Sequence, residues 1–336
     1  HREVPPLRHS APREAKGSKR LTSVSRERVK GMGDQPPQQV PTGDLPLVTD
    51  LVKEHQAVLD AVRRRPEVAS ILQPQHDDLF ILRYVLSFRG DVVKVATAIK
   101  QAIEWRRDNA AVLARIDELQ MEVRQIIPTG MLPWRTSQGQ PIQVAIPFAV
   151  DSKVWSTKSE QWHHEAGISN REVAYRICDQ LTRESGRLVK MVMIQDLTGL
   201  SLGFAMANSK LMQNQGKLSK LSEFLFPQLV ATVVITHPPS FVSTLYKMVG
   251  AVVSERLMKK MKLAESTDKL CQYASLSPDK VPHFLGGKYH WDADWVPPRV
   301  KASNGAPPMI LPQESSRSTD SPSSRKAVGI SFKGFM

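Results

Sequence analysis

The chain has 336 residues, of which 41% are hydrophobic, so its length and composition predict one large domain or two small ones with a hydrophobic core. Its two cysteines, Cys178 and Cys271, are too few for a disulfide framework or a zinc site and favour a reducing compartment. No run of eighteen apolar residues is present, and the first residues lack the features of a signal peptide. We therefore expect a cytoplasmic protein.

The formal net charge is +13, and the excess positive charge is concentrated towards both ends of the chain. Residues 1–46 carry +4 and residues 299–336 carry another +4, which leaves +5 for the middle. A nucleic-acid-binding domain needs a basic stripe on its folded part, so this distribution argues against a nucleic-acid partner. It is compatible with peripheral contact to an anionic membrane, where each cation near the surface contributes about 1 kcal/mol.

Both ends of the chain are predicted to be disordered basic tails. Residues 1–46 are rich in Pro, Arg, Lys and Gln, and residues 299–336 are rich in Ser and Pro. Residues 47–127, in contrast, show helical periodicity, and Asp91 is a suitable N-cap within them. The helices are expected over about residues 48–62, 77–87, 91–109 and 117–127. Residues 47–127 are thus predicted to form a small all-helical lobe.

From residue 128 the pattern changes to short apolar runs that alternate with helical segments. Strands are expected at residues 142–146, 188–194, 229–235 and 263–264. Helices are expected at residues 170–185, 204–214, 218–226 and 267–273. The run 188–194 has almost no polar alternation, so both faces of that strand should be covered. Strands separated by helices predict an α/β layer with a parallel or mixed sheet.

Residues 229–262 combine a strand, a proline stop and an unusual helix. The strand ends at Pro238-Pro239, which cannot continue a sheet ladder, and Ser240 is a suitable N-cap. The helix expected over residues 241–253 is apolar on most sides and too short to span a bilayer. A basic cluster follows it, made of Arg256, Lys259, Lys260 and Lys262. By itself the stretch is most simply a core helix with a solvated basic end, and the alternative is a lid over a ligand.

The sequence contains none of the common catalytic or metal-binding patterns. It has no phosphate-binding loop, no dinucleotide-binding Gly-x-Gly-x-x-Gly after a strand, and no nucleophile elbow. The densest metal-like group is His163-His164-Glu165, but adjacent helical residues point about 100° apart and no third ligand is suitably spaced. Asp196 suits a turn better than catalysis. We therefore expect no catalytic residue, no metal, no cofactor and no enzymatic activity.

Four separated stretches occur in the order found in one known family. They are residues 82–106 with Leu82-Arg83-Tyr84, Arg89-Gly90-Asp91-Val92 and Trp105-Arg106, then residues 192–201, residues 233–238, and Val281-Pro282 with Gly286-Gly287. The first resembles the N-terminal signature of the CRAL-TRIO lipid-binding family. The next two resemble its buried strand ending in Asp-x-x-Gly and its strand ending in Asn-Ala-Pro. The last resembles its closing Leu-Pro-x-x-x-Gly-Gly, so the resemblance covers roughly residues 75–290.

The resemblance implies the CRAL-TRIO fold, an α/β fold with a small N-terminal helical lobe, here residues 47–127, and a lipid-binding domain, here residues 128–298. That domain has a mixed β-sheet flanked by helices, and its hydrophobic cavity is closed by a gate helix, which residues 240–253 match. A gate has a physical purpose, because burying a CH₂ group is worth about 0.8 kcal/mol. A tail of ~16 carbons is therefore worth more than ~10 kcal/mol and must be kept from water.

The phosphatidylinositol-transfer branch of the family is matched only in part. Lys260 matches a lysine that follows the gate, whereas Gln228 replaces the Glu that partners it in that branch. The branch's phosphatidylcholine contacts fall at Met191, Met193 and Gln143, which argues against choline-lipid binding of that type. Methionines suit an adaptable apolar pocket, although they are equally ordinary core residues. The Leu-Arg-Ala-Arg of the helical lobe is replaced by Val-Leu-Ser-Phe at residues 85–88.

The resemblance thus implies a ligand site and a surface that contacts membranes. The expected ligand-binding residues are Gln143, Met191, Met193, Gln195, Phe224, Gln228, Phe241, Leu245 and Lys260. Arg256, Lys259 and Lys262 are expected to meet anionic headgroups. The expected function is binding, and intermembrane transfer or sensing, of a phosphatidylinositol-like phospholipid by a monomer that associates peripherally with membranes. The alternative left open is a transfer-inactive interaction module recruited to anionic membranes.

Overall fold

The computed structural model describes residues 44–149, 154, 157–201, 203–204, 209–239, 241 and 254–290. Apart from residues 44–46, the predicted basic tails lie outside the described residues. The predicted gate helix also lies outside them, with the exception of Phe241.

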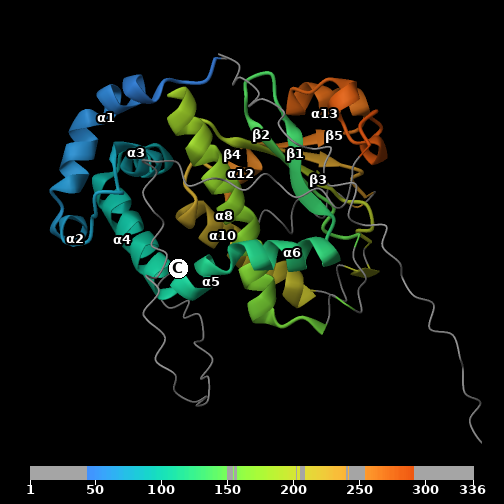
Figure 1. Ribbon diagram of the computed structural model, residues 1–336, viewed down its shortest axis with the longest axis horizontal. Helices are drawn as coiled ribbons and strands as arrows, with labels where there is room; N and C mark the ends of the chain where they lie inside the picture. Colours follow the sequence, from blue (N-terminus) through green and yellow to red (C-terminus); the bar gives the residue numbers. More distant parts are fainter. Residues whose placement is uncertain are drawn as a thin grey trace, which may run out of the picture. The chain divides into compact units, whose positions relative to one another are not determined.

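The first part of the described chain is entirely helical (Figure 1). Its helices are α1 (Val48–Arg63), α2 (Pro66–Ala69), α3 (Asp78–Ser87), α4 (Val92–Asp108), α5 (Ala110–Ala114) and α6 (Ile116–Ile126). The four helices predicted in this region are present. Asp77 and Asp91 cap α3 and α4, since their carboxylates accept hydrogen bonds from Phe80 N at 3.0 Å and Lys94 N at 3.1 Å. The sequence does not predict α2 and α5, because four or five residues are too few to show a helical period.

The second part contains a five-stranded mixed sheet, which confirms the predicted fold class (Figure 1). Its strands are β1 (Thr129–Arg135), β2 (Pro141–Ala145), β3 (Met191–Asp196), β4 (Val230–Thr236) and β5 (Met261–Ala264), in that spatial order. Strand β1 pairs with β2 antiparallel, and the remaining pairs are parallel. The sequence does not predict β1, because Gly130 and Pro133 interrupt its pattern. The strand tolerates the proline at the edge of the sheet, where its register with β2 is irregular.

Helices flank the sheet. They are α8 (Glu160–Ser185), α10 (Ser209–Leu225), α12 (Glu255–Met258) and α13 (Thr267–Ala274), followed by the short 3₁₀ segments η2 (Pro278–Lys280) and η3 (His283–Leu285). Helix α8 begins ten residues before the prediction, and α10 is continuous where two helices were predicted. Gly167 explains part of this difference, because a Cβ there would lie 2.0 Å from Leu218 Cδ2 of α10. The glycine permits close helix packing and does not end α8.

The two faces of the sheet pack against different layers. On one face, Val192 and Ile194 of β3 form a buried cluster with Leu270 of α13. At the start of the same strand, Met191 belongs to a separate buried cluster that includes Leu221 of α10 and many residues of α1, α3 and α4. The N-terminal helices and the sheet therefore share one continuous core.

A buried ionic junction joins α4 to α8. Glu172 is fully buried, and its carboxylate receives Arg106 Nη2 at 2.9 Å and Arg176 Nε at 3.1 Å. Burial alone would raise the pKa of the Glu172 carboxyl, but attraction to the two guanidinium groups holds that pKa below its ordinary value. The Arg106 guanidinium also lies 5.7 Å from the ring centroid of Phe226, so the junction reaches the end of α10.

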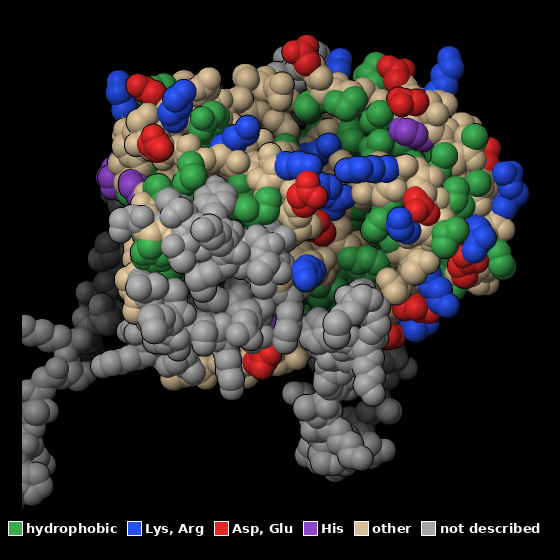
Figure 2. All heavy atoms as spheres, turned by 180° about the vertical axis from the view of Figure 1, so that it is seen from behind, with side chains coloured by type: hydrophobic (Ala, Val, Ile, Leu, Met, Phe, Trp, Pro, Cys, Tyr) green, Lys and Arg blue, Asp and Glu red, His purple; other side chains and the backbone are tan. Residues whose placement is uncertain are grey.

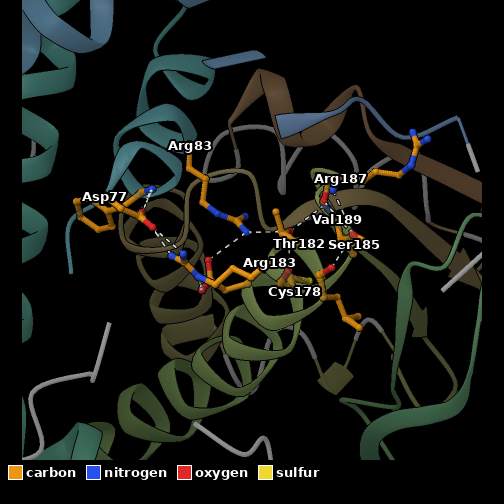
Figure 3. Close-up of polar contacts among 11 residues, drawn as sticks. Asp77, Arg83, Cys178, Thr182, Arg183, Ser185, Arg187 and Val189 are labelled. Carbon is orange, nitrogen blue, oxygen red and sulfur yellow. Dashed lines mark hydrogen bonds and ion pairs between the residues drawn. The ribbon is translucent and has the colours of Figure 1, made fainter. Parts of the chain in front are cut away.

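A second polar network joins α3 to α8 (Figure 3). Arg183 reaches Asp77 Oδ2 at 2.6 Å through Nη1 and Asp179 Oδ2 at 2.7 Å through Nε. Arg83, whose side chain is fully buried, donates from Nη2 to Thr182 Oγ1 at 3.2 Å. Ionic contacts and the shared core therefore hold the helical region against the long helix α8.

We expect Glu172→Gln to lower the free energy of unfolding by about 3 kcal/mol, because it leaves two guanidinium groups without their buried carboxylate. Glu184→Gln, an exposed substitution on the same helix, should change it by less than about 0.5 kcal/mol. Urea unfolding followed by circular dichroism measures both values. Equal stability of the two variants would show that the junction contributes little.

Candidate functional site

Side chains along the central strand β3 alternate between complete and partial burial. Val192 and Ile194 are buried, whereas Met193 and Gln195 keep part of their surface accessible. Both faces of this strand pack against other residues, as predicted, but the face that carries Met193 is only partly buried there.

The pairing registers continue this face across all five strands, where Ala145, Met193, Gln195, Met261 and Leu263 are its partly exposed residues and the others are buried. One row is Met131, Gln143, Met193, Val233 and Met261, and the next row is Thr129, Ala145, Gln195, Ile235 and Leu263. Side chains in register on adjacent strands lie on the same face of a sheet. The two rows therefore form one surface, which we call the open face, and it is largely apolar.

An apolar cluster borders the open face. It combines buried Leu197, Leu200, Val233 and Ile235 with partly buried Phe148, Met193, Phe204, Val230, Phe241, Leu257, Met261 and Leu263. Phe148 and Phe204 meet edge to face with ring centroids 5.6 Å apart. The cluster brings together segments that lie more than 100 residues apart in the sequence, from residue 148 to residue 263.

The structure places several predicted ligand-binding residues at this surface. Gln143, Met193 and Gln195 lie on the open face, and Phe241 packs in the cluster that borders it. Met191 lies on the same strand but is fully buried in the core that contains α8 and α10. The predicted ligand residue Leu245 lies outside the described residues.

The remaining predicted ligand residues lie near the N-terminal edge of the parallel strands. Phe224 is partly buried against the helical core. Gln228 has a φ of 60° and donates a hydrogen bond from Nε2 to Ser87 Oγ at 3.0 Å. Lys260 directly precedes β5 and donates from Nζ to the carbonyl oxygen of Val230, the first residue of β4. Gln228 and Lys260 are thus brought to the same end of the sheet.

Lys260 and Lys190 are cations with limited access to water. Burial, reinforced by the positive charges of Lys190 and Arg256, lowers the pKa of Lys260 to about 8. Burial likewise lowers the pKa of Lys190, with further contributions from Arg83 and Arg256. Three cations therefore lie within electrostatic reach of one another: Lys190, Arg256 and Lys260. We call them the cationic cluster.

Sequence reasoning missed Lys190. It is a single lysine in front of a buried strand, and only the pairing register brings it near Lys260. Figure 2 shows Lys and Arg side chains gathered with acidic ones on the face behind the view of Figure 1, in the region of α12. The sequence did contain a signal, because Lys190 directly precedes the apolar run 191–194 and a lysine is rarely buried without a partner.

The predicted membrane-contact residues differ in their surroundings. Arg256 donates to the carbonyl oxygen of Ser87 at 2.9 Å and pairs with Glu223 at 3.1 Å. Lys259 is exposed and pairs with Glu255 at 2.6 Å, and Lys262 is exposed on β5. Lys259 and Lys262 are therefore exposed to solvent, whereas Arg256 is partly buried and held by Glu223 and Ser87.

Asp196 organises the turn after β3, as predicted. Its Oδ1 accepts hydrogen bonds from Thr198 N at 2.9 Å and Thr198 Oγ1 at 2.8 Å, and His237 Nδ1 lies 2.8 Å from the same oxygen. Gly199 follows with a φ of +89°, and a Cβ there would lie 2.6 Å from the carbonyl oxygen of Phe148. The Asp-x-x-Gly pattern thus reflects a tight turn packed against backbone.

No group of three or more His, Cys, Asp or Glu side chains within the described residues is arranged to hold a metal ion. Among the helices that the structure describes, none combines the length and the apolar character required to cross a membrane.

Two comparisons with known proteins agree with this geometry. The family model described as CRAL/TRIO domain matches residues 129–287, which begin with β1 and end after η3. The crystal structure of Sfh5 is similar in fold, with a TM-score of 0.50 and 13% sequence identity over 67% of this chain and 83% of that chain. Residues 129–287 therefore form a CRAL/TRIO domain.

Proposed function

We propose that this protein binds a phospholipid of the phosphatidylinositol type and transfers it between membranes or senses it. The CRAL/TRIO family is in general a family of lipid-binding proteins and not of enzymes. The observation that carries the proposal is the combination of a partly open apolar face on β3 with the cationic cluster at the edge of the same sheet. A phospholipid of this type has an apolar tail that can cover the apolar face and a phosphate that can pair with the cationic cluster.

The open face suits a hydrocarbon tail. Met193 and Met261 belong to one row and keep accessible surface, and their flexible side chains adapt to an irregular apolar guest. Leu263 and Phe241 add further partly buried apolar surface. Each methylene group removed from water at this face contributes about 0.8 kcal/mol, so a whole tail supplies most of the binding free energy.

The cationic cluster suits the phosphate of the headgroup. Lys260 and Lys190 are disfavoured as cations in the free protein by burial and mutual repulsion, and an anion relieves that repulsion. Gln228 beside Ser87 offers a neutral amide for headgroup hydroxyls. Exposed Lys259 and Lys262 would contact anionic lipid while the ligand enters or leaves.

Closure of the site by a gate helix is part of the proposal and comes from the sequence. Of residues 240–253, only Phe241 is described, and its contacts with the apolar cluster support a start of the gate beside the open face. The domain limits at residues 47, 127 and 298, and the monomeric state, also stay predictions.

Native mass spectrometry of the protein purified from eukaryotic cells tests the function. We expect a copurified phospholipid, or uptake of phosphatidylinositol from liposomes by the empty protein. A protein that is empty and accepts no lipid would contradict the proposal and favour the transfer-inactive interaction module.

Met193→Gln should reduce the loading of phosphatidylinositol about tenfold, because a polar amide would face the hydrocarbon tail without a partner. Met121→Gln is the matched control, since Met121 is 58% exposed on α6, and it should leave loading unchanged. Transfer of fluorescent phosphatidylinositol from donor liposomes measures both variants. Similar loading by both would place the tail elsewhere.

Binding of phosphatidylinositol liposomes should weaken by up to about tenfold between pH 7 and pH 9. The protonated Lys260 that holds the phosphate becomes a minor species above its pKa of about 8, while a phosphodiester stays ionised. Lys260→Arg keeps the positive charge throughout this range and should remove most of the pH dependence. A pH profile that is the same for both proteins would show that Lys260 does not hold the anion.

A further inference from the structure

Glu223 of α10 holds two side chains at the start of α12. Its Oε2 accepts a hydrogen bond from Arg256 Nη2 at 3.1 Å, and its Oε1 accepts one from Ser254 Oγ. Arg256 also donates from Nη1 to the carbonyl oxygen of Ser87, so both terminal nitrogens of its guanidinium group are engaged. The Glu223 side chain is 21% exposed and the Arg256 side chain is 40% exposed, so the contact is only partly shielded from water.

Positive charge exceeds negative charge around this contact. Among the described residues that act on Lys260, the cations are Lys190 and Arg256 and the carboxylate is Glu223. The backbone explains their proximity. Met191 N, next to Lys190, donates to the carbonyl oxygen of Leu229 at 2.8 Å, and Lys260 Nζ donates to the carbonyl oxygen of the adjacent Val230.

A buried arginine, Arg83, acts on Lys190 through its positive charge and also pairs with Asp179 at 3.4 Å. Arg83 is fully buried, and its Nε and Nη1 have no hydrogen-bond partner among the described residues. Thr182 Oγ1 links Arg83 to the segment that contains Lys190 and leads into β3, because this oxygen accepts hydrogen bonds from Arg83 Nη2 at 3.2 Å and from Val189 N at 3.0 Å (Figure 3). Around Lys260, the single carboxylate of Glu223 therefore faces two further cations, Lys190 and Arg256.

We propose that Glu223 is an internal counter-ion, which occupies Arg256 until the phosphate group of a ligand takes its place. This inference rests on the proposed function, in which that phosphate belongs to a lipid headgroup. Glu223 receives only one N–H of Arg256, whereas a phosphate presents several acceptor oxygens and pairs with Arg in a bidentate manner. Glu223 therefore lowers the affinity for anions both by competition and by repulsion.

The exchange leaves the local fold intact. Ser254 Oγ caps α12 by accepting a hydrogen bond from Leu257 N at 3.1 Å, and this bond does not involve Glu223. Arg256 keeps its bond to the carbonyl oxygen of Ser87 while its second nitrogen changes partner.

Glu223→Gln tests the proposal, because the amide keeps an acceptor for Ser254 and removes the charge. Glu255→Gln is a matched control with the same change in net charge, since Glu255 lies next to Arg256 but is exposed and pairs with Lys259. Binding of inorganic phosphate, and of phosphatidylcholine vesicles that contain phosphatidylinositol, is measured at low ionic strength for each variant. We expect Glu223→Gln to tighten both about fivefold and Glu255→Gln to tighten both less than twofold.

Equal tightening by the two variants would overturn the proposal, because it would reflect net charge alone. Unchanged or weaker binding by Glu223→Gln, with an unchanged melting temperature, would also overturn it. In the double variant Glu223→Gln with Arg256→Gln, the gain should disappear. Tighter phosphate binding by Glu223→Gln without any lipid uptake would support the counter-ion role and refute the lipid carrier. Normal lipid uptake with no change in phosphate binding by Glu223→Gln would support the lipid carrier and refute the counter-ion role.

Discussion

Parallel pairing of β3 with β2 and β4 is the constraint on which the site depends. It fixes which side chains share a face of the sheet. Met193 therefore lies between Gln143 and Val233 on one face, and Ile194 points to the opposite face. It also makes β3, β4 and β5 start at the same edge of the sheet, which brings Lys190 near Lys260. The apolar face and the cationic cluster are therefore two consequences of one hydrogen-bond pattern.

The cationic cluster is costly in the free protein, and its neighbours show how that cost is limited. Lys260 places its ammonium group on the carbonyl oxygen of Val230, and Arg256 is held by Glu223 and Ser87. Neither arrangement neutralises Lys190, whose charge is opposed by burial. By contrast, the Glu172 junction joins its cations to one fully buried carboxylate. Charged side chains thus stabilise the fold at the Glu172 junction, whereas at the cationic cluster they leave positive charge that is not fully neutralised.

Features of the fold that depend on neighbouring residues could be predicted from the sequence. Features that depend on contacts between residues distant in sequence could not. Asp91 could be predicted as a cap because a cap acts within three residues. The first ten residues of α8 were not predicted, and Gly167 among them makes room for Leu218, about fifty residues later. Lys190 could not be assigned to the site, because its neighbours are defined by strand register. Gln143 and Met193 were named by resemblance, and only the register shows that they are adjacent.

The two ends of the proposed ligand relieve two different costs in the free protein. Water against Met193 and Leu263 is unfavourable because the surface is apolar, and this penalty scales with the area that a tail covers. Repulsion among the cations is unfavourable because burial weakens screening, and this penalty falls when one phosphate arrives. A soluble phosphate reduces the repulsion among the cations but leaves the apolar surface in water. A free fatty acid covers the apolar surface but brings no phosphate to the cations. An amphiphile with a phosphate at one end relieves both, and the proposed selectivity for phospholipids rests on the presence of the open face and the cationic cluster on one sheet.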